Sequence, residues 1–285
     1  MKLNNKGFAI SVILYSMIIL TIGVLYLLLG VLNTRYNLSK ETSDDVVDYI
    51  NNQGVNTITD DRASKIATTR IINTGNLLQK NGNYYYYGNN PNNYIRFNNE
   101  EWRIIGVISI NKVKYLKLIR NNYLKVASMD NYKVIESNIF EYLNNEYYPA
   151  MKDKNMVKDV YWNNAEYSTS ITALNAYNKE ITTSLNSKQY VGLIDGSDFG
   201  YTAGEAYLTK NLSSYNSSTS NWLSFSNNYF TMSYYGNNIN IVSNGNLVNT
   251  TSKNAYIYPC VYIKKDIFII GGVGTSSDPY ILSIS

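Results

Sequence analysis

The chain has 285 residues, of which 16% are charged; its net charge is +4, and it contains 29 tyrosines, one cysteine and no histidine. The absence of histidine excludes a Ser–His–Asp triad and histidine-ligated zinc, and a single cysteine excludes an internal disulfide and a cysteine-only zinc site. Because no run of Lys or Arg follows the pattern of a phosphate-binding surface, we expect no nucleic-acid partner.

An uncharged run of 25 residues, Phe8 to Leu32, follows directly on Lys6-Gly7. As a helix it would reach about 37 Å, which exceeds the ~30 Å hydrocarbon core of a bilayer. It is too long for the apolar core of a cleaved secretory signal, which has about 7–15 residues. We therefore expect a single-pass protein of the cell membrane, with the lipid bilayer as a partner. The flanking basic residues balance and the N-terminal amine breaks the tie, so the N-terminus is expected inside and the C-terminal bulk outside.

The junction Asn5-Lys6-Gly7-Phe8-Ala9-Ile10 resembles the prepilin leader of type IV pilin-like proteins. The resemblance implies that residues 1–7 are a leader, that a prepilin peptidase cuts between Gly7 and Phe8, and that the new Phe8 amine is methylated. The chain departs from that family at Val12, where pilins usually carry a Glu that registers subunits during assembly. This departure weakens the case for filament assembly more than the case for cleavage. A plain signal anchor fits the length as well and stays open.

Beyond the uncharged run, a thin apolar stripe of Leu38, Val46, Val47 and Ile50 keeps a helical period. We therefore expect residues 8–53 to form one transmembrane and stalk helix, and residues 54–79 to form a short helix and linker.

Residues 80–285 are predicted to form one ectodomain of the α+β class, a mostly antiparallel sheet with a helical middle. Short aromatic and β-branched runs separated by turn residues predict a four-stranded meander, with one packed and one wet face, at 84–87, 94–97, 102–108 and 112–120. Helices are expected at 137–145 and within 167–185, and a strand at 190–194. Further strands are expected at 229–235, 239–243, 246–249, 255–264 and 267–270, with a last one after a glycine-rich turn. We expect the first and last strands to pair.

The order of several motifs resembles a family of surface proteins from gut Gram-positive bacteria, whose ectodomain is similar to C-type-lectin-like folds. The resemblance rests on these segments: 93–97, 102–107, 116–120, 191–194, 221–223 and 258–264. They are core and turn residues, so the resemblance implies a fold and is nearly silent on activity. Tyr258 departs from the Arg that tends to precede the proline in that family. The sugar motifs of calcium-dependent lectins are absent, so calcium-dependent sugar binding is not implied.

Two pairs of carboxylates are candidates for glycoside hydrolysis, Asp195 with Asp198 and Glu100 with Glu101. The first pair lies in Asp195-Gly196-Ser197-Asp198, which is most simply a turn, and the second lies in a predicted hairpin turn. Arg103 is interpreted as a charge on a strand face. Cys260 lies in an apolar run and is predicted to be a small buried residue. We therefore expect no enzymatic activity, no metal and no cofactor.

The aromatic excess favours recognition, because exposed tyrosines offer large contact areas and a hydroxyl group at low rotamer cost. Alternate residues of each run must nevertheless face the core. The candidate binding residues are Tyr84, Tyr85, Tyr86, Tyr87, Tyr234 and Tyr235. The predicted function is a non-enzymatic, anchored, pilin-like surface protein for adhesion to a glycan or protein, or for packing into a filament with other pilin-like subunits. Two alternatives are an anchored carboxylate-dependent glycan hydrolase and a pseudopilus subunit of a secretion or competence system.

Overall fold

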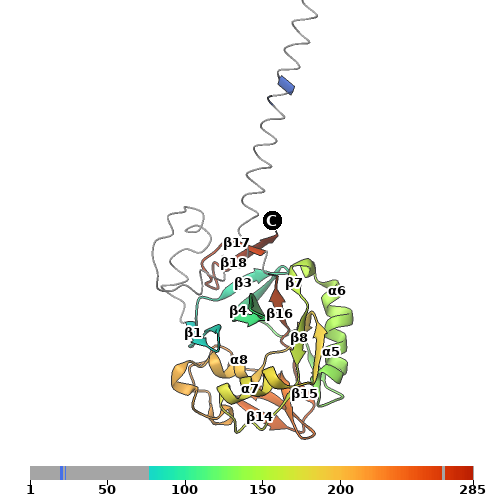
Figure 1. Ribbon diagram of the computed structural model, residues 1–285, viewed down its shortest axis with the longest axis vertical. Helices are drawn as coiled ribbons and strands as arrows, with labels where there is room; N and C mark the ends of the chain where they lie inside the picture. The colour runs from blue at the N-terminus through green and yellow to red at the C-terminus, as the bar shows by residue number, and fades with distance from the viewer. Residues whose placement is uncertain (1–19, 22, 24–76, 265–266, 285) are drawn as a thin grey trace, which may run out of the picture. The chain divides into compact units, whose positions relative to one another are not determined.

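The computed structural model describes residues 20, 21, 23, 77–264 and 267–284 (Figure 1). These belong to two compact units, Met1–Glu41 with Ser285, and Thr42–Ile284. In the first unit, Leu20, Thr21 and Gly23 are helical and exposed. The predicted leader, most of the predicted membrane and stalk helix, and nearly all of the predicted linker lie outside the described residues. All named strands and helices of the described residues belong to the second unit.

The described part of the second unit is a mixed α+β structure, rich in strands and with few helices. A ten-stranded sheet has the order β11-β16-β5-β4-β3-β18-β17, with β2 on β4, β1 on β2 and β7 on β16. Its strands are β1 (Leu77–Lys80), β2 (Asn83–Tyr86), β3 (Tyr94–Phe97), β4 (Glu100–Ile110), β5 (Val113–Arg120), β7 (Val157–Lys158), β11 (Val191–Gly192), β16 (Cys260–Ile263), β17 (Ile267–Gly271) and β18 (Tyr280–Ile284).

A six-stranded sheet has the order β14-β13-β12-β15-β6, with β9 on β12, and β8 pairs with β10 in a separate two-stranded sheet. The strands are β6 (Val126–Ser128), β8 (Val160–Asn163), β9 (Ala165–Glu166), β10 (Asn186–Gln189), β12 (Tyr229–Tyr235), β13 (Asn238–Ser243), β14 (Asn246–Thr250) and β15 (Asn254–Tyr256). Most pairs are antiparallel, as predicted. The exceptions among the described strands are β12 with β15, β12 with β9, and β18 with β3.

The helices lie in the middle of the sequence, as predicted. They are η1 (Val134–Glu136), α5 (Asn138–Tyr142), η2 (Leu143–Tyr147), α6 (Tyr148–Ala150), η3 (Lys154–Met156), α7 (Ala173–Thr182), α8 (Gly196–Tyr201), η4 (Glu205–Tyr207) and η5 (Leu212–Ser214). Side chains cap α5 and α7: Ser137 accepts from the Phe140 N–H before α5, and Thr172 accepts from the Asn175 N–H before α7. Segments α5, η2 and α6 follow one another without a break (Figure 1).

The predicted meander is wrong in one pairing. Strands β3, β4 and β5 pair in sequence order, but β2 pairs with β4 and not with β3. The reason is that β3 covers only Glu100–Arg103 of the eleven-residue β4, which leaves Gly106 and Val107 free to pair with β2. A side chain at Gly106 would place its Cβ only 2.0 Å from the Tyr84 carbonyl oxygen, so the glycine permits this close approach.

The expected wet face of the meander is also wrong, because β4 and β5 are covered on both faces. Arg103 in β4 is 5% exposed and Lys117 in β5 is 1% exposed. The guanidinium carbon of Arg103 lies 4.3 Å from the centroid of the Trp222 ring, and Lys117 meets the N-terminal end of α8. Burial lowers the pKa of Arg103 to about 10.

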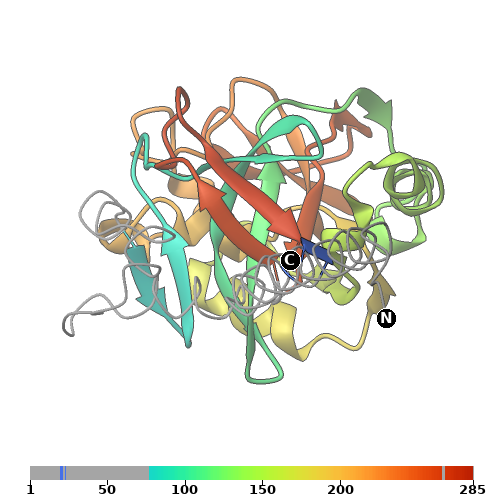
Figure 2. The same cartoon turned by 90° about the horizontal axis from the view of Figure 1, so that it is seen from above.

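The predicted strand 255–264 is divided between the two larger sheets. Asn254–Tyr256 forms β15 in the six-stranded sheet, and Cys260–Ile263 forms β16 in the ten-stranded sheet. Pro259 lies at the crossing, where it has no N–H to donate to a ladder and its carbonyl accepts from Arg120. The expected pairing of first and last strands is wrong too: β18 pairs with β3 and lies beside β17 (Figure 2), whereas β1 pairs with β2.

Buried apolar side chains from both larger sheets form one contiguous core. Helix α8 lies within it, and all six of its residues are buried. A Cβ at Gly200 would lie 2.5 Å from the Cβ of Ala173, so this glycine lets α8 pack closely on α7. Just before α8, Ile194 forms a bridge to Thr231 of β12. The start of the helix is therefore held by β12 of the six-stranded sheet and, through Lys117 of β5, by the ten-stranded sheet.

Candidate functional site

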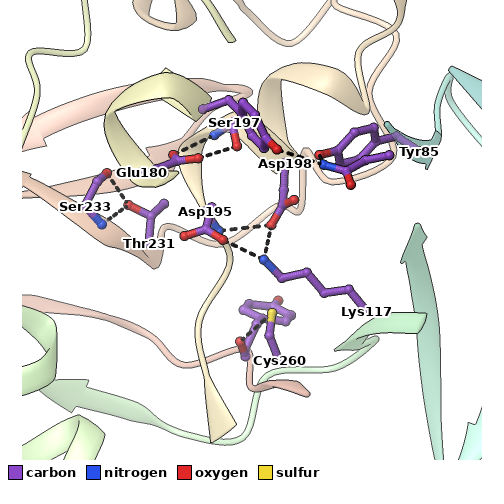
Figure 3. A network of polar contacts seen from close by, with 12 residues as sticks. Tyr85, Lys117, Glu180, Asp195, Ser197, Asp198, Thr231, Ser233 and Cys260 are labelled. Atoms are coloured by element: carbon purple, nitrogen blue, oxygen red, sulfur yellow. Dashed lines mark hydrogen bonds and ion pairs between the residues drawn. The ribbon is translucent and has the colours of Figure 1, made fainter. Parts of the chain in front are cut away.

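The segment Asp195-Gly196-Ser197-Asp198, predicted to be a turn, begins helix α8. Asp195 is the N-cap, and the Asp198 carboxylate accepts the Asp195 N–H at 3.2 Å, which is part of a capping box. An acidic N-cap followed three residues later by a second acid is a sequence signature of a helix start, so the signal was present. The structure thus brings together the two carboxylates that the sequence proposed as a pair (Figure 3).

A lysine that the sequence analysis did not select occupies the space between these carboxylates. Nζ of Lys117 lies 2.5 Å from Oδ2 of Asp198 and 2.6 Å from Oδ2 of Asp195 (Figure 3). The side chains of Lys117 and Asp198 are 1% and 4% exposed, and that of Asp195 is 20% exposed. Burial by itself lowers the pKa of Lys117, but the two carboxylates overcome it and raise the pKa well above its ordinary value.

Aromatic rings surround the ammonium group of Lys117. Nζ lies 5.6 Å from the centroid of the Trp162 ring and 5.4 Å from that of Tyr262, which is its neighbour across the β5–β16 ladder. Trp162 packs over Gly192, where a Cβ would lie 2.2 Å from Cε3 of the indole. The glycine therefore makes room for the ring that covers the lysine, and cation–π attraction adds to the ion pairs.

A third carboxylate, Glu180 of α7, supports the start of α8. Its Oε1 accepts the Tyr167 hydroxyl at 2.6 Å and the Ser197 N–H at 3.1 Å, and its Oε2 accepts the Ser197 hydroxyl. Burial and then the charge of Asp195 raise the pKa of Glu180 to about 8, and burial raises the pKa of Asp195 to about 6. This raised pKa favours the neutral form of Glu180, and a neutral Glu180 adds no negative charge beside Asp195 and Asp198.

The prediction that Cys260 is a buried residue is confirmed, since it is 0% exposed and lies in β16, between β11 and β5 and near Lys117 (Figure 3). Burial raises the pKa of its thiol well above the ordinary value, which disfavours the reactive thiolate.

Neither predicted carboxylate pair is free to act on a substrate in this structure. Glycoside hydrolysis needs two carboxyl groups on either side of a sugar, whereas Asp195 and Asp198 both contact one ammonium. Glu100 forms a bidentate ion pair with Arg120, whose Nε and Nη2 lie 3.0 Å and 3.1 Å from the two carboxylate oxygens. Glu101 accepts a hydrogen bond from the side-chain amide of Asn121. Among the described residues, no group of three His, Cys, Asp or Glu side chains is placed to hold a metal ion.

The tyrosines proposed for binding are mostly inside the protein. Tyr85, Tyr86 and Tyr234 are buried, Tyr84 and Tyr87 are half-buried, and Tyr235 is exposed. Tyr87 packs against Gly204, and Tyr234 contacts the ring of Tyr132. Binding through these six tyrosines stays a prediction. Of the six, only Tyr235 and the exposed parts of Tyr84 and Tyr87 are accessible to a partner.

A different group of rings reaches the surface where the chain passes from one sheet to the other. We call Tyr123, Phe225, Tyr256 and Tyr258 the aromatic surface cluster. Tyr123 stands 4.7 Å from Tyr256, and Phe225 stacks on Tyr258 at 4.4 Å, as measured between ring centroids. Tyr123 is 45% exposed, Phe225 and Tyr256 are half-buried, and Tyr258 is buried. These residues are scattered through the sequence, so no local signal could have grouped them.

The loop that carries Tyr123 is fixed by Arg120. The guanidinium, held by Glu100, donates to the carbonyl oxygens of Asn122 and Tyr123 at 3.0 Å and 2.6 Å. The next residue is also bound, since the Leu124 N–H donates to the carbonyl of Ile257. The most exposed ring of the cluster is therefore presented on an ordered backbone.

No family model, no curated protein and no solved structure matches this chain. Of the described residues, none belongs to a helix that is long and apolar enough to cross a membrane. The predicted processing residues, Gly7 and Phe8, lie outside the described residues, as does the uncharged run apart from Leu20, Thr21 and Gly23.

Proposed function

We propose that this protein is a non-enzymatic surface protein, anchored in the cell membrane by residues 8–53, whose ectodomain binds a glycan through the aromatic surface cluster. The observation that carries the proposal is the 45% exposed ring of Tyr123, packed on Tyr256 and fixed by Arg120. Preorganised aromatic side chains give large contact area with little loss of entropy on binding. The uncharged run Phe8–Leu32 and the C-type-lectin-like resemblance remain parts of this proposal.

A neutral, hydroxyl-rich ligand suits the surroundings of the cluster better than a charged one. Asn227 donates to the Tyr258 hydroxyl at 3.4 Å, and Asn122 beside Tyr123 is exposed. Arg120, which fixes the Tyr123 loop, is engaged by Glu100 and two carbonyls and is not available to a ligand anion. The engagement of Asp195 and Asp198 by Lys117 also speaks against the hydrolase alternative.

Binding is tested with the full chain in detergent or nanodiscs, on an array of purified bacterial and host polysaccharides. Tyr123→Ala should weaken binding by about 30-fold, the loss typical of a central aromatic contact. Tyr161→Ala is the matched control, because Tyr161 is 64% exposed on β8 and outside the cluster. Equal affinity of the Tyr123→Ala variant and the unchanged chain would contradict the proposal.

Anchoring and processing need a separate test. Mass spectrometry of the native N-terminus should find a methylated Phe8, and the protein should fractionate with membranes. An intact Met1 or Lys2 would rule out prepilin-type cleavage and leave a plain signal anchor. Co-purification with other pilin-like chains would favour the pseudopilus alternative.

A further inference from the structure

Lys117 contacts two carboxylates in buried, apolar surroundings that favour a neutral bond over an ion pair. Its Nζ lies 2.6 Å from Asp195 and 2.5 Å from Asp198, and the lysine side chain is 1% exposed. The neighbouring surfaces are the rings of Trp162 and Tyr262. Burying opposite charges costs much of their hydration, so a buried ion pair gains little over neutral groups. Conversion of an ammonium and a carboxylate into an amide would remove both charges from the interior.

We propose that Nζ of Lys117 and Cγ of Asp195 become joined by an amide bond after folding, with Asp198 carrying protons between them. The fold supplies what such a condensation needs: an amine and a carboxyl group held in contact, a second carboxylate beside both, and little bulk water to reverse the reaction.

The reaction balances without any added reagent. Nζ begins with three protons; it passes one to the Asp198 carboxylate and, as a free amine, attacks Cγ of Asp195. The new C–N bond forms and one C–O bond of Asp195 breaks. The departing oxygen leaves as water with two of the original Nζ protons, delivered through Asp198, which ends as the carboxylate that it was at the start. The third proton stays on the amide nitrogen.

Three observations assign Asp195 as the electrophile and Asp198 as the proton carrier. The Asp195 side chain is 20% exposed against 4% for Asp198, which gives the released water a path out. Burial raises the pKa of Asp195 to about 6, so its carboxylate takes up an Nζ proton from Asp198 more readily than an ordinary aspartate would, which makes Cγ open to attack by the free amine. The raised pKa of Lys117 means that its proton must be taken by a neighbour, and Asp198 is at 2.5 Å.

The bond would tie the central strand β5 to the first turn of α8. It would link residues separated by 78 positions in the sequence, across the core between the two larger sheets. A covalent bond that closes a loop of this length lowers the conformational entropy of the unfolded chain, as a disulfide does. Unlike a disulfide, it can form in a chain that has one cysteine.

Peptide mass spectrometry tests the bond on the full chain, isolated from membranes and digested with trypsin. The expected product is a branched peptide made of residues 115–120 and 189–210, lighter than its two parts by one water molecule and uncut after Lys117. Fragmentation should place the branch at Asp195. Only linear peptides, cleaved after Lys117, would overturn the proposal, and so would a branch at Asp198.

Variants separate the roles of the three residues. Asp195→Asn should still form the bond, losing ammonia in place of water, so its branched peptide should have the same mass as that of the unchanged chain. Asp198→Asn should give linear peptides only. Lys114→Met, on the same strand, is the control and should keep a branched peptide. Bond formation at the normal level in Asp198→Asn would overturn the proton-carrying role.

Discussion

Lys117 and Asp198 meet with 2.5 Å between Nζ and Oδ2, although 81 residues separate them in the chain. One belongs to a central strand of the ten-stranded sheet, and the other to the first turn of a helix that packs toward the six-stranded sheet. The contact therefore joins the two halves of the core, and its two partners are among the most buried charged side chains of the described residues.

Replacing the lysine should destabilise the fold strongly. Lys117→Met leaves the carboxylates of Asp195 and Asp198 inside the protein without their cation, and breaking a buried pair in this way costs about 3–5 kcal/mol. Chemical denaturation of the full chain in detergent measures the loss. Lys80→Met is the control, because Lys80 pairs with the exposed Glu205 and such surface pairs contribute about 1 kcal/mol or less. A similar small loss for both variants would contradict a buried pairing.

Stability should fall as the pH rises from 4.5 toward about 8, on account of Glu180. Its pKa is raised from 4.5 to about 8 in the folded protein, so in this window the folded state holds a proton that the unfolded state has lost. In molecules whose Asp195 is not joined to Lys117, the raised pKa of Asp195, about 6, acts in the same direction.

Glu180→Gln removes the Glu180 contribution while keeping an acceptor for Tyr167 and the Ser197 N–H. Its unfolding free energy should match the unchanged chain near pH 4.5 and exceed it above pH 8, by on the order of a few kcal/mol. Thermal or denaturant unfolding followed across this range checks the expectation. Parallel curves for the two proteins would show that Glu180 does not titrate abnormally.

Gly192→Ala should disturb the aromatic cover of Lys117. The added methyl group would lie 2.2 Å from the indole of Trp162, so the ring must move, at a cost of about 1–3 kcal/mol. Near-ultraviolet circular dichroism and tryptophan fluorescence should both change. Gly271→Ala serves for comparison, because its nearest neighbour would be an ordinary 3.7 Å away and the change should cost less than about 1 kcal/mol. An unaltered spectrum in Gly192→Ala would argue against this packing.

Arg120→Lys should weaken glycan binding although it removes no aromatic side chain. Lysine keeps the charge, but it cannot pair with Glu100 at two points and also donate to the carbonyls of Asn122 and Tyr123. We expect a several-fold loss of affinity together with faster hydrogen exchange in the loop 121–125. Unchanged affinity with a loosened loop would show that preorganisation of Tyr123 is unimportant.

Much of the strand content could be predicted from the sequence, because alternation and turn residues are local signals. The Asn-Gly turn between β13 and β14 and the split between β3 and β4 at Asn98-Asn99 are examples. Which strands pair with each other was less predictable than where the strands lie. Nothing near Tyr84 indicates that β2 avoids β3, since that outcome depends on the length of β4 and on Gly106.

Only part of the candidate site could be predicted from the sequence. Asp195 and Asp198 could be singled out from their spacing, although their helix was missed because Gly and Ser between them favour a turn. Lys117 could not be singled out, because a lysine in an alternating strand normally points to water. The burial of Lys117 depends on two carboxylates that lie 78 and 81 residues away in the sequence. The aromatic surface cluster could not be predicted either, because it depends on contacts between residues far apart in the sequence. Tyr123 and Tyr256 become neighbours through the pairing of β6 with β15.

A double-mutant cycle on the unfolding free energy, with Lys117→Met, Asp198→Leu and the combined variant, tests most directly whether these two residues hold the core together. Once Lys117 is gone, losing Asp198 should cost much less than it does in the unchanged chain, or even restore stability, because a buried charge without a partner is removed. We predict a coupling energy above about 1.5 kcal/mol. Losses that add to within about 0.5 kcal/mol would contradict the central role given to this contact.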